Sequence, residues 1–332
     1  MKPNILKIVP IAIFIVFLQA FGVCFAQDAQ TTGYVFKPFK FAFVPDTHLS
    51  FEKNDGWILT NESLVILQDT VDHLGNLPDL KFAVFGGDLV DKKENRLSDM
   101  ELLVDIFSEL KHPYYVIFGD TDADTDENYT QTDFTAEFKF NGFRNIYQSY
   151  WKEQLEENIL LIGLDSSQSG SFNGYLPDEQ LEWLKSVLEE NKDKFTVIFI
   201  HHPPIQEFDE KYRLKNSLAF QELVKHYPQV KIVLSGHAHR NFTRNIDGTL
   251  YIVSPSIVTY PNKYKILTVY PDKVSVENKQ ISFKQIIKKG KKLLPATDFA
   301  RETNLSKKEL YKMLNGDEFS NKKEYYFIRN AD

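Results

Sequence analysis

The sequence has a single cysteine, Cys24, and it lies in an apolar N-terminal segment. Lys2 and Lys7 precede the run IVPIAIFIVFLQAFGVCFA, and Cys24 and Ala26 supply the small residues that signal peptidases require before a cleavage site. We therefore expect residues 1–26 to be a signal peptide that exports the chain to the periplasm or the medium. The alternative is that residues 8–26 stay as a membrane anchor. A chain cleaved after Ala26 has no cysteine, which excludes disulfides, thiol catalysis and thiolate metal ligands.

An excess of positive charge is also missing. The 39 Lys and Arg residues are outnumbered by 46 Asp and Glu, and the formal net charge of −7 argues against a general nucleic-acid binder. Residues 282–332 differ, because they carry 12 Lys and Arg against 7 Asp and Glu. Two interpretations of this basic, helix-prone tail stay open: weak contact with an anionic surface, or a solvated helical face. Its lysine cluster consists of Lys288, Lys289, Lys291 and Lys292.

Apolar and aromatic residues are abundant, at 42% and 14%, which is enough for a sizeable core. Short apolar runs end abruptly in polar residues, as in FKFAFVPDTH, LKFAVFGGD, FTVIFIHHPP and VKIVLSGHAH. Runs that are apolar at successive positions predict strands covered on both faces, and segments with helical spacing lie between them. The alternation predicts an α/β domain over residues 38–281, with ligands gathered beyond the carboxyl ends of its strands.

Five of the eight histidines fall in three short blocks, and two further blocks are rich in aspartate. A single block is weak evidence, although residues i and i+2 of an extended segment point the same way and can chelate. Five blocks that each follow an apolar strand predict a metal site. The blocks are Asp46-Thr47-His48, Gly87-Asp88-Leu89-Val90-Asp91, Gly119-Asp120-Thr121-Asp122, His201-His202-Pro203-Pro204 and Gly236-His237-Ala238-His239.

The order of these blocks, over roughly residues 40–270, resembles the calcineurin-like metallophosphoesterases. The segment 164–184, with LDSSQSG and EQLEWL, is similar to the branch that contains bacterial cyclic-nucleotide phosphodiesterases and related phosphatases. The resemblance implies a four-layer αββα sandwich of two mixed sheets flanked by helices. It also implies hydrolysis of a small phosphoester by a water that two divalent metal ions activate. It identifies neither the substrate nor an oligomeric state.

The resemblance further implies how the metal ligands divide between two ions. Asp88 is the expected bridge; Asp46, His48 and His239 complete one site, and Asp120, His201 and His237 complete the other. Asp88, Asp120 and His202 are the expected catalytic residues, and His202 could also orient ligands, as we expect Asp91 and Asp122 to do. Purple acid phosphatases of this family carry Tyr where this chain has Asp91, so two divalent ions are expected. Mn²⁺ is the first expectation, with Zn²⁺, Fe²⁺ and Mg²⁺ as alternatives.

The stretch GDTDAD at residues 119–124 departs from the family pattern. It is not an EF-hand loop, because Thr125 and Gln131 stand where that loop needs Gly and Glu. Asp120 replaces the family's Asn and leaves about one net positive charge on two divalent ions, which favours phosphodiesters over phosphate dianions. Thr121 replaces a His that can protonate the leaving group, and such help is worth about 10²–10⁴-fold. The alternative function is therefore a metal-binding, non-catalytic protein with a binding or regulatory role. We expect Asp124, Asp126 and Glu127 to form a solvated turn.

Overall fold

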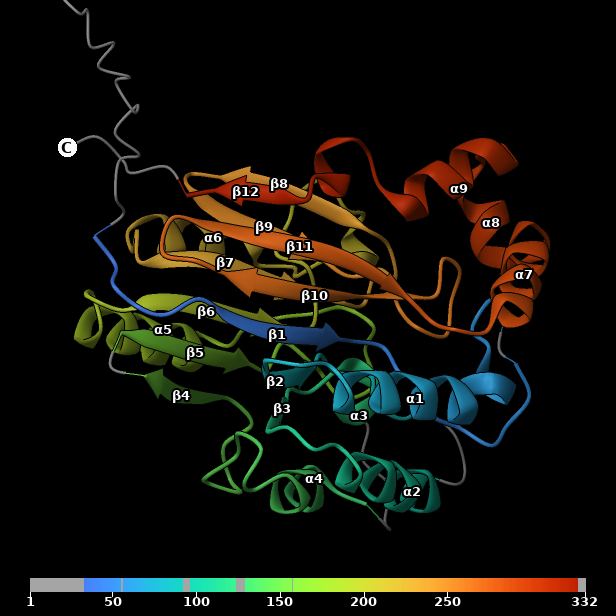
Figure 1. The fold of residues 1–332 in the computed structure, drawn as a ribbon, viewed down its shortest axis with the longest axis horizontal. Coiled ribbons are helices and arrows are strands. Elements are labelled where there is room, and N and C mark those ends of the chain that lie inside the picture. The colour runs from blue at the N-terminus through green and yellow to red at the C-terminus, as the bar shows by residue number, and fades with distance from the viewer. Residues whose placement is uncertain (1–32, 55, 92–95, 124–128, 157, 328–332) are drawn as a thin grey trace, which may run out of the picture. The chain divides into compact units, whose positions relative to one another are not determined.

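The computed structural model describes residues 33–327 apart from 55, 92–95, 124–128 and 157. A first mixed sheet has the strand order β12-β11-β10-β1-β2-β3 (Figure 1). In it β1, β2 and β3 run parallel, whereas β10, β11 and β12 are added by antiparallel pairing. Its strands are β1 (Phe39–Val44), β2 (Leu80–Phe85), β3 (Tyr114–Val116), β10 (Lys263–Val269), β11 (Lys273–Gln280) and β12 (Glu324–Tyr326).

The second sheet has the order β4-β5-β6-β7-β9-β8. Its four central strands run parallel, and β4 and β8 close the two edges by antiparallel pairing. The strands are β4 (Trp151–Glu156), β5 (Ile159–Leu164), β6 (Phe195–Ile200), β7 (Val230–Ser235), β8 (Phe242–Ile246) and β9 (Thr249–Val253). Both sheets are therefore mixed; the parallel strands form one side of the first sheet and the centre of the second.

The apolar runs form strands because both of their faces are buried. In β6, Phe195, Val197 and Phe199 belong to a core shared with the first sheet, while Ile198 and Ile200 face the opposite way. This is the period of two that a strand imposes on its side chains. The ring of Phe199 meets that of Phe41 from β1 edge-on, with centroids 5.9 Å apart. One core therefore joins the two sheets.

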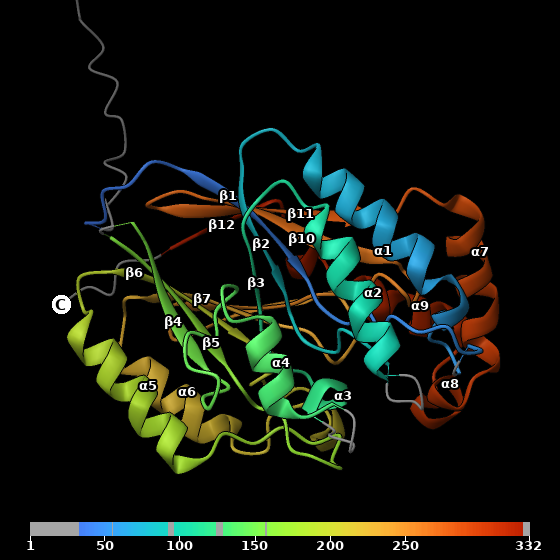
Figure 2. The same ribbon diagram turned by 90° about the horizontal axis from the view of Figure 1, so that it is seen from below.

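Helices cover the outer faces of both sheets (Figure 2). Helices α1 (Thr60–Gly75) and α2 (Arg96–Ser108) pack on the first sheet, and α5 (Asp178–Glu190) and α6 (Ser217–Lys225) on the second. The fold is thus the expected four-layer αββα sandwich. The connections hold short helices: α3 (Asp120–Ala123), α4 (Gln131–Glu137) and the 3₁₀ turns Glu210–Tyr212, Leu294–Ala296 and Phe319–Asn321.

The C-terminal segment packs on the sandwich. Helices α7 (Lys284–Leu293), α8 (Asp298–Thr303) and α9 (Lys307–Asn315) lie together at one end of the sheets, and the chain then returns as β12 (Figures 1 and 2). Asn241, which precedes β8, anchors the end of α9: its backbone N–H donates to Leu314 O at 2.9 Å and its side chain to Asn315 O at 2.9 Å. The segment therefore belongs to the same compact unit as the sandwich.

The predicted signal peptide, residues 1–26, and the alternative anchor, residues 8–26, lie outside the described residues. So do Asp124, Asp126 and Glu127 of the expected solvated turn. Among the helices that the structure describes, none is both long enough and apolar enough to cross a membrane.

Candidate metal centre

The strand-end residues of both sheets meet at one edge of the sandwich. Asp46 and His48 follow β1, Asp88 follows β2, and Asp120 begins α3 after a short connection from β3. From the second sheet, His201 follows β6, and His237 and His239 follow β7. The carboxyl ends of parallel strands lie on one edge of a sheet, so the fold itself gathers these side chains.

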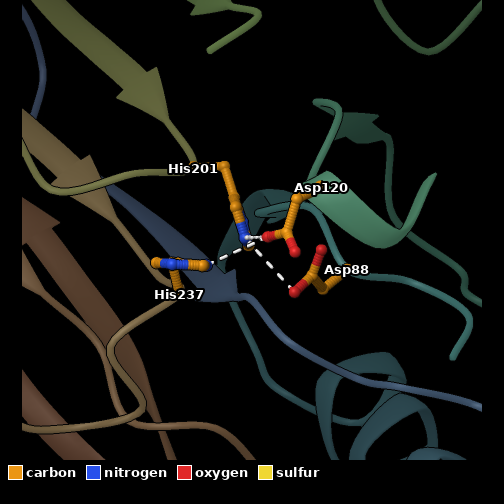
Figure 3. Close-up of side chains that lie close together, drawn as sticks. All are labelled: Asp88, Asp120, His201 and His237. Atoms are coloured by element: carbon orange, nitrogen blue, oxygen red, sulfur yellow. Dashed lines mark ion pairs between the residues drawn. The ribbon is translucent and has the colours of Figure 1, made fainter. Parts of the chain in front are cut away.

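Four of them form one group of candidate ligands: Asp88, Asp120, His201 and His237 (Figure 3). His201 Nε2 lies 3.3 Å from Asp88 Oδ2 and 3.3 Å from Asp120 Oδ1. His237 Nδ1 lies 3.0 Å from the same Asp120 oxygen. Two imidazoles and two carboxylates thus point at a common centre, which suits a divalent ion of borderline hardness.

Asp46, His48 and His239 form the second group. His48 Nε2 lies 3.2 Å from His239 Nε2, which in turn lies 3.4 Å from Asp46 Oδ1. Asp88 Oδ2 joins the two groups, because it lies 3.7 Å from His48 Nε2 as well as 3.3 Å from His201 Nε2. The structure therefore brings these seven residues together in the two groups expected from the sequence, with Asp88 between them, and their role as metal ligands stays a prediction.

Five of these seven residues have a left-handed backbone. The φ angles are 56° at Asp46, 39° at His48, 51° at Asp88, 60° at His237 and 49° at His239. Residues other than glycine adopt this conformation at a cost of about 1–3 kcal/mol, and such residues cluster at functional sites. Backbone hydrogen bonds between the first two strand ends hold the turn, from Asp46 N to Gly87 O and from His48 N to Asp88 O, both at 2.9 Å. Sequence reasoning missed this feature, although Asp and His tolerate the region better than most residues.

Backbone carbonyls orient two of the imidazoles. His201 Nδ1 donates to Gly86 O at 2.8 Å, and His237 Nε2 donates to Lys211 O at 3.1 Å. These hydrogen bonds assign the tautomers and leave His201 Nε2 and His237 Nδ1 as electron-pair donors toward the centre. Lys211 was not expected to contribute to the site.

Asp122 fixes the loops that carry Asp88 and Asp120. Its carboxylate accepts hydrogen bonds from the backbone N–H groups of Leu89 and Gly119, both at 2.9 Å. Burial and the charge of Asp88 raise the pKa of Asp122 to about 7. Asp91 Oδ1 lies 3.7 Å from His48 Nδ1. Asp122 thus contacts the backbone of the loops that carry Asp88 and Asp120, and Asp91 lies beside His48.

Thr121 holds the candidate bridge. Its backbone N–H donates to Asp88 Oδ1 at 3.0 Å, and its hydroxyl lies 2.8 Å from Val90 O and 3.1 Å from Asp88 Oδ1. The hydroxyl is thus engaged within the protein, and it offers no acidity near neutral pH. Thr121 therefore replaces the family's histidine as a positioning residue.

His202, an expected catalytic residue, has both ring nitrogens engaged. Nδ1 lies 2.9 Å from Ser166 Oγ, and Nε2 donates to Phe172 O at 3.2 Å. Burial and the neighbouring His237 and His201 hold the pKa of His202 well below its ordinary value, so the ring is neutral. The ring is fully buried and lies outside the set of residues that line the cavity at the centre.

The electrostatics of the centre fit two cations. Burial opposes charge on the His48 ring, but Asp91, Asp88 and Asp46 outweigh it and raise the pKa of His48 to about 9. Burial would raise the pKa of Asp88, yet the facing His201 and His48 hold it below its ordinary value. Moreover, Asp120 Oδ1, His201 Nε2 and His239 Nδ1 are buried without a hydrogen-bond partner. Carboxylates that converge in this way, together with oxygen and nitrogen atoms whose lone pairs have no hydrogen-bond partner, are suitable ligands for two divalent ions.

A cavity of about 450 Å³ opens on the centre. The part of its wall that comes from the C-terminal segment was not foreseen from the sequence, because that segment carries no motif. Besides Asp88, Asp91, Asp120, Thr121, His48, His237 and His239, the lining includes Trp57, Ile58, Phe172, Tyr212, Thr297, Asp298, Phe299 and Glu302.

Comparison with known proteins agrees with this geometry. The family model described as calcineurin-like phosphoesterase matches residues 39–241. A protein of Arcobacter nitrofigilis named "Probable glycerophosphodiester phosphodiesterase GpdQ" is 32% identical over 208 residues, covering 59% of this chain and 70% of its own. One of Colwellia psychrerythraea named "Probable cyclic nucleotide phosphodiesterase" is 27% identical over 213 residues, covering 62% and 73%.

Solved structures share the fold. A dimetal phosphatase from Danio rerio superposes with a TM-score of 0.63 at 14% identity, over 72% of this chain and 95% of its own. A purple acid phosphatase from yellow lupin gives a TM-score of 0.51 at 14% identity, over 75% and 52%. With the family model covering more than half of the sequence and the five motif blocks meeting in one centre, this chain belongs to the calcineurin-like phosphoesterase family.

Proposed function

We propose that this protein hydrolyses phosphodiesters at a centre of two divalent metal ions. The observation that carries the proposal is the placement of Asp88 Oδ2 between the two ligand groups, 3.3 Å from His201 Nε2 and 3.7 Å from His48 Nε2. A shared carboxylate oxygen is what two ions a few ångströms apart require. Bound there, the ions would polarise the phosphoryl group and lower the pKa of water.

The charge of the ligand set favours a diester. Asp46, Asp88 and Asp120 supply three carboxylates, where the family's Asn in place of Asp120 would leave two. Two divalent ions then keep about one net positive charge, which attracts a monoanionic diester and attracts a phosphate dianion less than a set with two carboxylates would. Relatives named as cyclic nucleotide and glycerophosphodiester phosphodiesterases support the same substrate class.

The residues around the centre position the candidate metal ligands, and none of those described below is free to protonate the leaving group. Asp122 fixes the loops of Asp88 and Asp120, and the carbonyls of Gly86 and Lys211 fix two imidazoles. The Thr121 hydroxyl is engaged with Val90 O and Asp88, and both nitrogens of His202 are engaged as well. We therefore expect the leaving oxygen to depart with little protonation, so that esters of acidic phenols react much faster than esters of alkanols.

Mn²⁺ is the metal that we propose first. The donor set consists of imidazoles and carboxylates without sulfur, and Asp91 replaces the tyrosine of a ferric site. Such a set also accepts Zn²⁺, Fe²⁺ and Mg²⁺. Reconstitution of the metal-free protein with each ion in turn tests the assignment.

We further propose that the protein is exported and that α7 contacts an anionic surface weakly. Export rests on the signal-like residues 1–26. Ile286 and Ile287 of α7 pack against the core, which leaves the lysines at 288 and 292 exposed. Cell fractionation tests the first proposal. Binding to anionic vesicles at low and high salt, with and without Lys288→Gln and Lys292→Gln, tests the second.

The experiment that tests the function is hydrolysis of bis-p-nitrophenyl phosphate by Mn²⁺-loaded protein. We expect turnover by the wild type, none by His237→Ala, and unchanged turnover by His226→Ala, which removes an exposed histidine at the C-terminal cap of α6. Two bound ions without turnover of this diester or any other phosphoester would contradict the proposal and favour a non-catalytic, metal-binding role.

A further inference from the structure

The cavity at the metal centre has an aromatic wall that the family domain does not supply alone. We define the aromatic wall as Trp57, Tyr212 and Phe299, which all line the cavity. Phe299 belongs to α8, beyond residues 39–241 that match the family model. The C-terminal segment thus completes the site in which the substrate must bind.

The three rings extend from one ligand group to the other. Phe299 stacks on Trp57, with ring centroids 4.2 Å apart and planes only 4° from parallel. The Trp57 ring also lies 5.2 Å from that of His239, and the Tyr212 ring lies 6.3 Å from that of His237. Tyr212 meets Phe299 edge-on at 6.3 Å. The aromatic wall therefore lies beside both halves of the metal centre.

Contacts on both sides hold this surface in place. Glu302 of α8 forms an ion pair with Lys211, whose carbonyl accepts the hydrogen bond from His237. The Thr297 side chain caps α8 by accepting a hydrogen bond from Ala300 N at 3.3 Å. Behind α8, Leu294, Ala300, Leu310 and Leu314 form a small buried cluster. The aromatic wall is thus preorganised, which reduces the entropy cost of binding a rigid flat group.

The charges around the wall are already balanced. Glu302 pairs with Lys211, and Asp298 pairs with Arg301. The two α8 carboxylates that line the cavity are therefore paired with cations, and the rings of the wall offer stacking and apolar contact. Flat aromatic groups, nucleobases included, are the chemical class that such rings bind best.

We propose that the aromatic wall binds a flat aromatic substituent of the phosphodiester, on the ester oxygen that is not cleaved. The inference rests on the proposed function and narrows it to aryl or nucleoside esters. Trp57 and Phe299 then determine specificity, and a diester whose retained group is a small alkyl chain binds more weakly.

The test compares three diesters that share the p-nitrophenolate leaving group, so that the bond broken stays the same. The retained groups are methyl, p-nitrophenyl and thymidine 5′-yl. In the wild type we expect KM for the aryl or nucleoside ester to be about tenfold or more below that of the methyl ester. Phe299→Ala and Phe299→Leu should remove most of this difference in KM. Phe283→Ala, a substitution of a partly exposed phenylalanine outside the cavity, is the control.

Each outcome separates this inference from the proposed function. Metal content is measured first, because Trp57 contacts the ligand His239. If the wild type turns over all three esters with the same KM, the aromatic subsite is overturned. The same holds if Phe299→Leu changes the KM of all three esters by the same factor. In both cases the proposed phosphodiesterase activity is supported. A preference for the thymidine ester over the aryl ester identifies a nucleobase as the group bound; the reverse identifies an unspecific aryl subsite. If no ester reacts, the affinities of the protein for thymidine 5′-monophosphate and for methyl phosphate are compared. Equal affinities overturn the inference. Tighter binding of thymidine 5′-monophosphate that is lost in Phe299→Leu supports it.

Discussion

Asp120 sets the charge of the centre. As a carboxylate it adds a negative charge that the family's asparagine lacks, and its Oδ1 lies 3.0 Å from His237 Nδ1 and 3.3 Å from His201 Nε2. We predict that Asp120→Asn lowers Mn²⁺ affinity about tenfold or more and raises monoester relative to diester hydrolysis, because the loaded centre gains one positive charge. Competition with a chelator and rates on p-nitrophenyl phosphate and its bis ester measure both effects.

The matched control is Asp247→Asn, which neutralises an exposed carboxylate in the turn before β9 at a left-handed position that Asn tolerates. It should change neither quantity. An Asp120→Asn protein with unaltered Mn²⁺ affinity would contradict a role for this carboxylate at the metal.

Metal binding should release protons. Without metal, neighbouring carboxylates raise the pKa of His48 to about 9 and raise that of His201 well above its ordinary value despite burial. At pH 7 the His48 ring is therefore charged and must lose a proton before its nitrogen can bind an ion, and the raised pKa of His201 acts in the same direction. Mn²⁺ affinity should rise as pH rises from 6 toward 9.

Calorimetric titrations at pH 7, in two buffers that differ in ionisation enthalpy, measure the protons released. We expect more than one proton for two Mn²⁺ ions bound. Identical heats in both buffers would show that the imidazoles are already neutral and that this account of the centre is wrong.

At the scale of elements, the junction of β3 and α3 depends on a glycine. A Cβ on Gly119 would lie 2.1 Å from the backbone nitrogen of Asp88 and 2.2 Å from its Oδ1. We predict that Gly119→Ala displaces Asp88, lowers the free energy of unfolding by about 1–3 kcal/mol and abolishes high-affinity metal binding. Gly75→Ala is the control, because a Cβ there meets nothing within 4 Å. Urea unfolding and metal content are measured for both variants. The same free energy of unfolding and the same metal content in both would contradict the prediction.

The motif-bearing elements could be predicted from the sequence, whereas the contribution of α8 to the cavity wall could not. Asp88 and His201 each follow an apolar run, and the rule that parallel strands present their carboxyl ends together places them at one edge. Trp57 and Phe299 are far apart in the sequence, and neither belongs to a motif. Their stacking depends on how α8 docks, which in turn depends on Asn241 binding the end of α9. Contacts between segments so far apart in the sequence produce no local sequence pattern from which they could be predicted.

For the whole molecule, residues 284–326 are a structural part of the sandwich. β12 pairs with β11 at the edge of the first sheet, and Leu310 and Leu314 are buried beneath the C-terminal helices. We predict that a chain ending at Ser282 unfolds at a urea concentration well below that of the full chain, because it loses this apolar burial, worth about 1.5–3 kcal/mol for each large side chain. Equal midpoints would show that the segment contributes nothing to stability.

In the proposed dinuclear centre, Asp88 joins the two metal ions. The most direct measurement is X-ray anomalous scattering from crystals of Mn²⁺-loaded protein at the manganese absorption edge. We expect two peaks about 3.5–4 Å apart on either side of Asp88. One should lie among Asp120, His201 and His237, and the other among Asp46, His48 and His239. A single peak at saturating Mn²⁺, or two peaks that do not share Asp88, would contradict the dinuclear centre and the chemistry inferred from it.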